Sequence, residues 1–327
     1  MTKLIFSTLT LAAFVFNMVM ANSALASRAR LLVLGDGTGG VVLNNYGGGG
    51  NSGSLIYNDK YSIFYNPVLL NPQLEWAVVE KSNGVDSAQG GFSTTILNFK
   101  TAVYLNRPLA GNYGASLAPV DFVLSADMGI QWGLGLTYAR ADDDTKHLGI
   151  RLGFSYYGFE PFFNMTLQGS SLVGKNENLL GGLRYRLGEW TPFVAYRKDK
   201  VGNGLANTVE VFAVGMGRHF DVTEGVKMNW GLSYASRTVN QGVNQHLFPF
   251  EISVEAEAAS WLTLRGGFAY KKSGSSARMG AGIHVGKATL DWALGGSGAN
   301  TSTESIETLQ FGFDSNFFTA ASLSYEW

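Results

Sequence analysis

Large apolar residues recur at every second position along much of this chain. In the segment 227–237 (KMNWGLSYASR), Met228, Trp230, Leu232 and Tyr234 are apolar, and small or polar residues lie between them. A period of two places successive side chains on opposite faces of a β-strand. The same alternation occurs in residues 128–139, 147–158, 179–188, 247–258 and 260–272. Since no helical stripe accompanies it, the pattern predicts an all-β protein.

The face opposite the apolar residues separates two kinds of all-β protein. In a soluble β-sandwich that face meets water and carries many charged residues, but here it is mostly Gly, Ala and Ser with an occasional Arg or Glu. Such a face is typical of the inner wall of a membrane barrel. Aromatic pairs such as Trp132 and Tyr138 bracket one strand, as interfacial girdles do. We therefore expect residues 73–327 to form a transmembrane antiparallel β-barrel of about 14–16 strands.

The count of candidate strands leaves one conflict. It includes a strand that begins near Thr94 and another that begins near Ile306. With this count, the polar loops 199–207 and 295–305 fall on the same side as the C-terminus. In outer-membrane barrels the periplasmic turns are usually short. If the C-terminus is periplasmic, this count places long loops where short turns are expected, so the count can be wrong by one strand.

Residues 1–26 have the parts of a secretory signal peptide. Lys3 gives a positive start, LIFSTLTLAAFVFNMVM gives an apolar core, and Ala24 and Ala26 form a small-residue cleavage site. We expect cleavage before Ser27. An uncleaved membrane anchor is the alternative, which the polar residues within the core disfavour. Because the chain has no cysteine, disulfides and thiolate metal sites are excluded.

The composition limits the function classes. The 327 residues include 42 Gly, 21 Phe, 14 Tyr and 7 Trp, and only 15% are charged, which is unusual for a soluble enzyme. A net charge of −1 gives no polybasic surface, so we expect no nucleic-acid partner. The four histidines lie in no nucleophile motif and have no metal-ligand spacing. We therefore expect neither an enzyme nor a metal site.

The chain ends in an alternating strand, FFTAASLSYEW, whose last residue is Trp327. This segment resembles the terminal strand of bacterial outer-membrane proteins, whose closing aromatic residue is read by the barrel insertion machinery. The resemblance implies that machinery, membrane lipids and lipopolysaccharide as partners, and the outer membrane of a Gram-negative cell as the location. The sequence is compatible with an oligomer, but no feature of it identifies a trimer interface.

Residues 27–72 form a glycine-rich segment that alternates poorly. It contains LLVLGDGTGG, in which Gly35, Gly37 and Gly40 have the spacing of a dinucleotide-binding fingerprint. That motif needs a helix after its glycines, but four consecutive glycines follow and disfavour one. We therefore expect no cofactor, and a conformational role for the glycines.

The end of this segment carries a family resemblance. YNDKYSIFYNPVLLNP resembles the opening signature of the long-chain fatty acid transporter family, with Asn58, Asp59, Asn66 and Pro67 among the matching residues. Val68 departs from the small residue usual after the proline. In that family this region is an N-terminal hatch inside the barrel, so the resemblance implies a hatch here. A loose periplasmic tail is the alternative.

Alternation also assigns ionisable residues to the inner face, where we expect them to line the lumen. Glu255 or Glu257 should lie near Arg265 across a hairpin. In one interpretation the opposite charges of such pairs neutralise each other and the side chains only fill the lumen. In the other, the charges create an electric field across the lumen that selects small hydrophilic solutes. The candidates are Lys100, Arg151, Arg184, Arg186, Glu251, Glu255, Glu257, Arg265, Arg278, His284 and Asp291.

These observations favour an outer-membrane, porin-like channel for passive passage of small hydrophilic solutes. A hatch-gated transporter of hydrophobic substrates such as fatty acids is one alternative, which a charged wall fits less well. A structural outer-membrane barrel without transport is the other. Conductance would favour the channel, and co-purified lipid the hydrophobic route.

Overall fold

The computed structural model describes most of the barrel and part of the N-terminal segment. The described residues are 27–35, 40–43, 53–82, 88–107, 109, 117–141, 145–171, 174–202, 208–240, 242–271, 274–299 and 317–327. The expected signal peptide, residues 1–26, lies outside them. No helix in these ranges is both long and apolar enough to cross a membrane.

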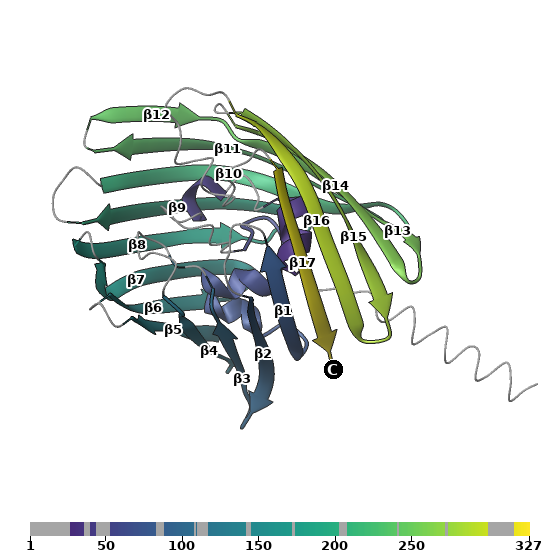
Figure 1. The fold of residues 1–327 in the computed structure, drawn as a ribbon, viewed down its shortest axis with the longest axis horizontal. Helices are drawn as coiled ribbons and strands as arrows, with labels where there is room; N and C mark the ends of the chain where they lie inside the picture. The colour runs from purple at the N-terminus through teal and green to yellow at the C-terminus, as the bar shows by residue number, and fades with distance from the viewer. Residues whose placement is uncertain are drawn as a thin grey trace, which may run out of the picture.

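The strands form one closed antiparallel sheet (Figure 1). Apart from β12 and β13, each strand pairs with its neighbours in the sequence, and β1 pairs with β17 from Trp76 opposite Glu326 to Ser82 opposite Ala320, which closes the barrel. The strands are β1 (Trp76–Ser82), β2 (Gln89–Ile96), β3 (Phe99–Leu105), β4 (Val120–Asp127), β5 (Gln131–Arg140), β6 (Lys146–Ser155), β7 (Phe159–Ser171), β8 (Gly174–Tyr185), β9 (Trp190–Val201), β10 (Thr208–Thr223), β11 (Val226–Val239), β12 (Val243–Leu247), β13 (Phe250–Ala259), β14 (Leu262–Lys271), β15 (Gly274–Val285), β16 (Ala288–Ala299) and β17 (Phe317–Glu326).

Two of these strands share one position in the wall. Strands β12 and β13 both pair with β11, β12 with its second half and β13 with its first. Between them lie Phe248 and Pro249, and proline has no N–H to donate to a ladder. The seventeen labelled strands therefore occupy sixteen positions. The predicted antiparallel barrel of 14–16 strands is confirmed.

The expected strand boundaries are wrong in one region. The single strand expected from Thr94 is a hairpin of β2 and β3, which are joined by Leu97 and Asn98, both with positive φ. Because this tight turn contains neither Gly nor Pro, the two strongest breaker signals are missing from it. The strand expected from Ile306 begins outside the described residues, but β16 pairs directly with β17.

The direct pairing of β16 with β17 removes the conflict over loop lengths. No wall position separates these two strands, so the long connections after β9 and β16 lie at the end opposite the C-terminus. The turns at the C-terminal end are short, such as residues 224–225 and 286–287. The expected placement of loops 199–207 and 295–305 beside the C-terminus is wrong. The observed placement is that of an outer-membrane barrel.

The two faces of the wall have opposite character. Leu232, Leu264 and Leu323 point outward and are about half exposed, at 50%, 48% and 55%. Their neighbours Ser233 and Arg265 point inward and are buried. An apolar exterior around a polar interior is the reverse of a soluble protein and is typical of a barrel surrounded by lipid.

The described part of the N-terminal segment packs against the inner face of the wall. Figure 1 shows its short helices, in purple and blue, enclosed by the strands. Helix α2 (Arg28–Leu34) contacts β13 to β17, α3 (Gly40–Leu43) contacts β9 and β10, and the 3₁₀ helix η2 (Pro67–Leu70) contacts β3 to β6. The 3₁₀ helix η1 (Lys60–Phe64) packs on η2. We call the described residues 27–35, 40–43 and 53–73 the plug.

Local signals explain the plug helices. The Ser27 side chain accepts a hydrogen bond from the Arg30 N–H and caps α2. Asp59 and Ser62 form a capping box at η1, and Pro67 begins η2 with a preset φ. Gly35 has φ +95° and ends α2. The apolar run before the glycines is therefore helix, whereas a dinucleotide fingerprint needs a strand there.

Glycines in the wall allow the plug backbone to approach closely. A Cβ on Gly267 would collide with the carbonyl oxygen of Val33 in α2, and a Cβ on Gly133 would collide with the backbone of Pro67 in η2. Only a residue without a side chain fits at such contacts. Many inward glycines of the alternating pattern therefore accommodate the plug.

Candidate functional site

A buried ion cluster lies on the inner face of β4 to β6. Asp121 of β4 accepts hydrogen bonds from Arg107 Nε and Nη2 at 2.9 and 3.0 Å. It also accepts from Arg151 Nη1 of β6 at 2.7 Å and from the Thr137 hydroxyl of β5 at 2.5 Å. Asp121, Thr137 and Arg151 point inward from three successive strands, and Arg107, which follows β3, joins them. Two guanidinium groups share one carboxylate.

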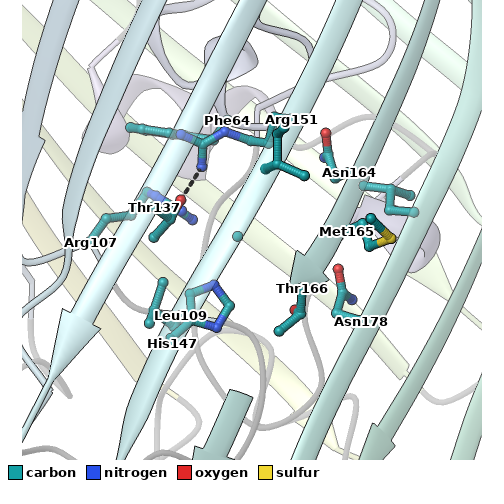
Figure 2. A pocket seen from close by; sticks show the side chains of 13 residues that line it. Phe64, Arg107, Leu109, Thr137, His147, Arg151, Asn164, Met165, Thr166 and Asn178 are labelled. Atoms are coloured by element: carbon teal, nitrogen blue, oxygen red, sulfur yellow. Dashed lines mark hydrogen bonds between the residues drawn. The ribbon is translucent and has the colours of Figure 1, made fainter. Parts of the chain in front are cut away.

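This cluster borders a cavity of about 60 Å³ (Figure 2). The plug contributes Phe64, over whose ring the Arg107 guanidinium lies at 4.4 Å from the centroid. The wall contributes His147, Asn164 and Asn178, whose side chains surround the opening in Figure 2. Cationic, amide and imidazole groups therefore gather where the plug meets β5 to β8. Such a mixture offers hydrogen-bond donors and acceptors to a polar group in the cavity.

A second ion cluster fixes helix α2 to the opposite wall. Arg30 binds Glu255 with two hydrogen bonds, at 2.6 and 2.9 Å. Arg265 donates to Glu255 at 2.6 Å and to Asp291 at 2.5 Å, and Asp291 accepts from the Ser27 hydroxyl at 2.6 Å. Burial lowers the pKa of Arg30, but the adjacent Glu255 carboxylate outweighs burial and holds that pKa above its ordinary value. The guanidinium therefore stays charged.

A third cluster holds the middle of the plug. Arg184 is fully buried and donates to Glu160 and to the side chain of Asn58. Asp59 caps η1 and is fully buried, and its burial raises its pKa to about 7, although the charges of Arg30 and Arg184 oppose this rise. Ionisation of Asp59 near neutral pH therefore affects the stability of the plug.

A fourth contact joins the plug to the first strand. Glu80 of β1 accepts hydrogen bonds from the hydroxyls of Tyr61 and Tyr104 and, at 2.7 Å, from the Arg28 N–H. Burial raises the pKa of Tyr61 well above its ordinary value, as does the Glu80 charge. The phenol therefore stays protonated as a donor. Together the clusters attach the plug to the wall from several sides.

The structure places the remaining predicted lumen residues as follows. The register sets Glu255 opposite Arg265, whereas Glu257 pairs with Thr263 and is exposed. Arg186 is 42% exposed and binds Glu160 at 2.6 Å. The other predicted residues make these contacts: Lys100 donates to the Gln73 carbonyl at 2.9 Å, Arg278 lies 3.9 Å from Glu251 and contacts the Leu32 carbonyl, and the His284 ring contacts Thr263 and Thr289.

The predicted hatch residues lie within the plug. Asn58 and Asp59 precede η1, and Asn66 and Pro67 begin η2. The Asn66 side chain lies against Gly153 of β6. The NPVLL segment is therefore the part of the plug that rests on strands β3 to β6.

The sequence reasoning missed several residues of these clusters. Asp121 and Glu160 alternate with the apolar residues of their strands and were open to the same inward assignment. Arg107 follows β3, and Arg30 lies in α2, where a period of two carries no information. Across the described ranges, no group of three or more His, Asp or Glu side chains is arranged to hold a metal ion.

Comparison with known proteins supports the fold. No protein-family model and no curated protein sequence matches the chain. A bacterial polysaccharide outer membrane secretin matches with a TM-score of 0.52 and 8% identity, over 78% of this chain and 98% of that chain. Two weaker matches are a porin (TM-score 0.45, 9% identity, 78% and 99% covered) and Wzi of Escherichia coli, described as a carbohydrate-binding β-barrel in group 1 capsule assembly (TM-score 0.43, 10% identity, 77% and 84% covered). The chain thus has the fold of outer-membrane β-barrel proteins.

Proposed function

We propose that this chain is a porin-like channel of the outer membrane, through which small hydrophilic solutes pass passively and which the plug narrows. The observation that carries the proposal is the charged inner wall of a sixteen-position barrel. Barrels of this size have room for an aqueous channel. Buried ion pairs at Asp121, Glu160, Glu255 and Asp291 give the interior the polarity that such a channel needs.

The arrangement of the plug supports a route along one side of the lumen. Toward β7 to β11 the plug packs by apolar contacts, in which Leu43, Leu55 and Tyr65 meet Phe162 and Phe193. Toward β4 to β8 it borders the polar cavity beside Arg107. Water and hydrophilic solutes would pass along the polar side because the apolar side offers them no hydrogen bonds.

Planar-bilayer recordings test this proposal. The purified full-length protein should give stepwise conductance that persists at low voltage, and proteoliposomes should swell in small sugars but not in large oligosaccharides. Protein denatured by heat and reconstituted in the same way is the control. A folded barrel that gives neither conductance nor swelling would exclude the channel.

A hatch-gated route for hydrophobic substrates is a second candidate, which the apolar cluster favours. Its wall residues Phe162, Leu180 and Phe193 would contact an acyl chain if the plug residues Leu43 and Leu55 moved away. Mass spectrometry of lipid extracted from the purified protein tests this candidate. Stoichiometric fatty acid together with absent conductance would favour it, and absence of both would favour a structural barrel.

The proposal also includes the barrel insertion machinery, membrane lipids and lipopolysaccharide as partners of the chain. The Trp327 N–H and indole Nε1–H donate to the Glu75 carbonyl and carboxylate, at 3.1 and 2.8 Å. These bonds join the last residue to the chain just before β1, so they form as the barrel closes. We place recognition of Trp327 by the insertion machinery before closure, and contact with lipids and lipopolysaccharide on the outward leucine face after it.

A further inference from the structure

We propose that the cavity between Phe64 and strands β5 to β8 binds a small oxyanion, either a carboxylate or a phosphate. The cavity lies beside the polar side of the proposed channel, so the physiological role of this site rests on the proposed function. Binding itself can be measured without conduction.

The charges around the cavity do not balance. Asp121 carries one negative charge and interacts with Arg107 and Arg151, which carry two positive charges. Among the described residues, those that line the cavity include no Asp or Glu, and the ionisable group there besides the two arginines is the His147 imidazole. One positive charge is left in excess, and a buried charge without a counterion is costly. An anion in the cavity would balance it.

Unused hydrogen-bonding groups indicate the same kind of ligand. Arg151 uses only Nη1, toward Asp121 and Thr137, and its buried Nε and Nη2 have no hydrogen-bond partner among the described residues. Asn164 is 8% exposed and lines the cavity, and its Oδ1 has no partner there either. A flipped amide would present its NH₂ group instead. An oxyanion provides acceptors for guanidinium and amide donors together.

The size of the cavity limits the ligand. Its volume of about 60 Å³ has room for about four to six water molecules, since each needs about 10–15 Å³ of such space. An ion of a few heavy atoms, such as acetate or phosphate, takes the place of a comparable number of water molecules. Phe64, Leu109 and Leu180, which are buried, supply the apolar part of the lining.

Isothermal titration calorimetry on the folded full-length protein in detergent tests the site. The probes are sodium acetate and inorganic phosphate, each against chloride at equal ionic strength. Either preference supports the site: acetate would indicate carboxylate solutes and phosphate would indicate phosphorylated ones. Arg151→Gln removes the excess charge but leaves the Arg107 and Asp121 pair, so affinity should fall at least about tenfold.

Matched variants separate the site from the overall charge. Arg151→Lys should keep most of the affinity, and Asp121→Asn should strengthen binding because it raises the local charge from +1 to +2. Arg218→Gln removes one positive charge in the second half of β10, outside the cavity, and should leave binding unchanged. Retained β-sheet circular dichroism shows that each variant is folded.

Three results would overturn the proposal. The first is no binding of either probe by the wild-type protein, and the second is wild-type affinity in Arg151→Gln. The third concerns Asp142, Asp143 and Asp144, which lie outside the described residues in the loop before β6. If only their triple Asn variant bound the probes, these aspartates would be the counterions. Conductance without anion binding would support the proposed channel and exclude the oxyanion site. Anion binding without conductance would support the oxyanion site and exclude the channel.

Discussion

Arg30 of helix α2 and Glu255 of strand β13 form a bidentate ion pair, with Nε 2.6 Å from Oε2 and Nη2 2.9 Å from Oε1. The same carboxylate accepts a hydrogen bond from Arg265 across the β13–β14 ladder. One side chain of the wall thus joins a barrel hairpin to the plug. Glu255 is therefore the side chain whose replacement tests most directly how the plug is attached to the wall.

Replacing Glu255 with Gln should loosen α2. The change leaves two arginines without a shared counterion, and removing one partner of a buried pair costs about 3–5 kcal/mol. Since the chain has no cysteine, Val33→Cys on α2 provides a single thiol, and its maleimide labelling rate reports release of the helix. Labelling should accelerate in the Glu255→Gln background. The exposed Glu257→Gln is the control, and equal rates in the two backgrounds would show that this pair does not hold the plug.

The plug should weaken as the pH rises toward neutrality. In the folded protein the pKa of Asp59 is about 7, whereas in an unfolded chain it is about 3.9. The folded pKa is raised, so the stabilisation is complete below about pH 4, falls as the pH rises, and is lost above about pH 7, by at most about 4 kcal/mol. Labelling of Ile63→Cys, corrected for thiol ionisation with an exposed cysteine, should therefore increase from pH 5 to pH 8.

Asp59→Asn is the matched variant for this pH dependence. Asn still caps η1 through Ser62 but does not ionise. Its labelling should not vary with pH after the same correction. A pH dependence equal to that of the wild-type protein would assign the effect to another group.

An arginine on the outward face should be costly in the middle of the wall. Leu232 lies at the centre of β11 and is 50% exposed, so Leu232→Arg should lower the unfolding free energy by about 2–4 kcal/mol. Val285 ends β15 beside a short turn, where the same residue should cost about 0–1 kcal/mol. Equilibrium unfolding in lipid vesicles measures both. Equal costs would mean that Leu232 does not face the hydrocarbon core.

Removing the terminal aromatic side chain should reduce assembly. Trp327→Ala deletes the group proposed for recognition by the insertion machinery, and also its bond to Glu75. The fraction of folded barrel in outer-membrane preparations should decrease several-fold. Trp261→Ala, at a tryptophan of the β13–β14 turn that is 55% exposed against 45% for Trp327, is the control. Equal yields of the two variants would remove the special role of the last residue.

The sequence by itself determined which face each strand residue occupies. A strand alternates its side chains because of backbone geometry alone, so the outward Leu232 and the inward Arg265 follow from the period of two. The same local rule places Glu255 or Glu257 beside Arg265, and the register of the folded hairpin, with its irregularity after Glu257, selects Glu255. The barrel and its approximate size therefore needed no tertiary information.

Only the tertiary structure decided what the inward residues meet. Asp121 finds its partners on two neighbouring strands and beyond β3, and Glu255 finds Arg30 in a helix 225 residues away. These contacts depend on how the sheet closes and on where the plug lies inside the barrel. No short segment of the sequence determines either. The cavity beside Arg107 was hidden for the same reason, because its lining comes from the plug and from four strands. Alternation assigns a side chain to a face, but closure and plug packing supply its neighbours.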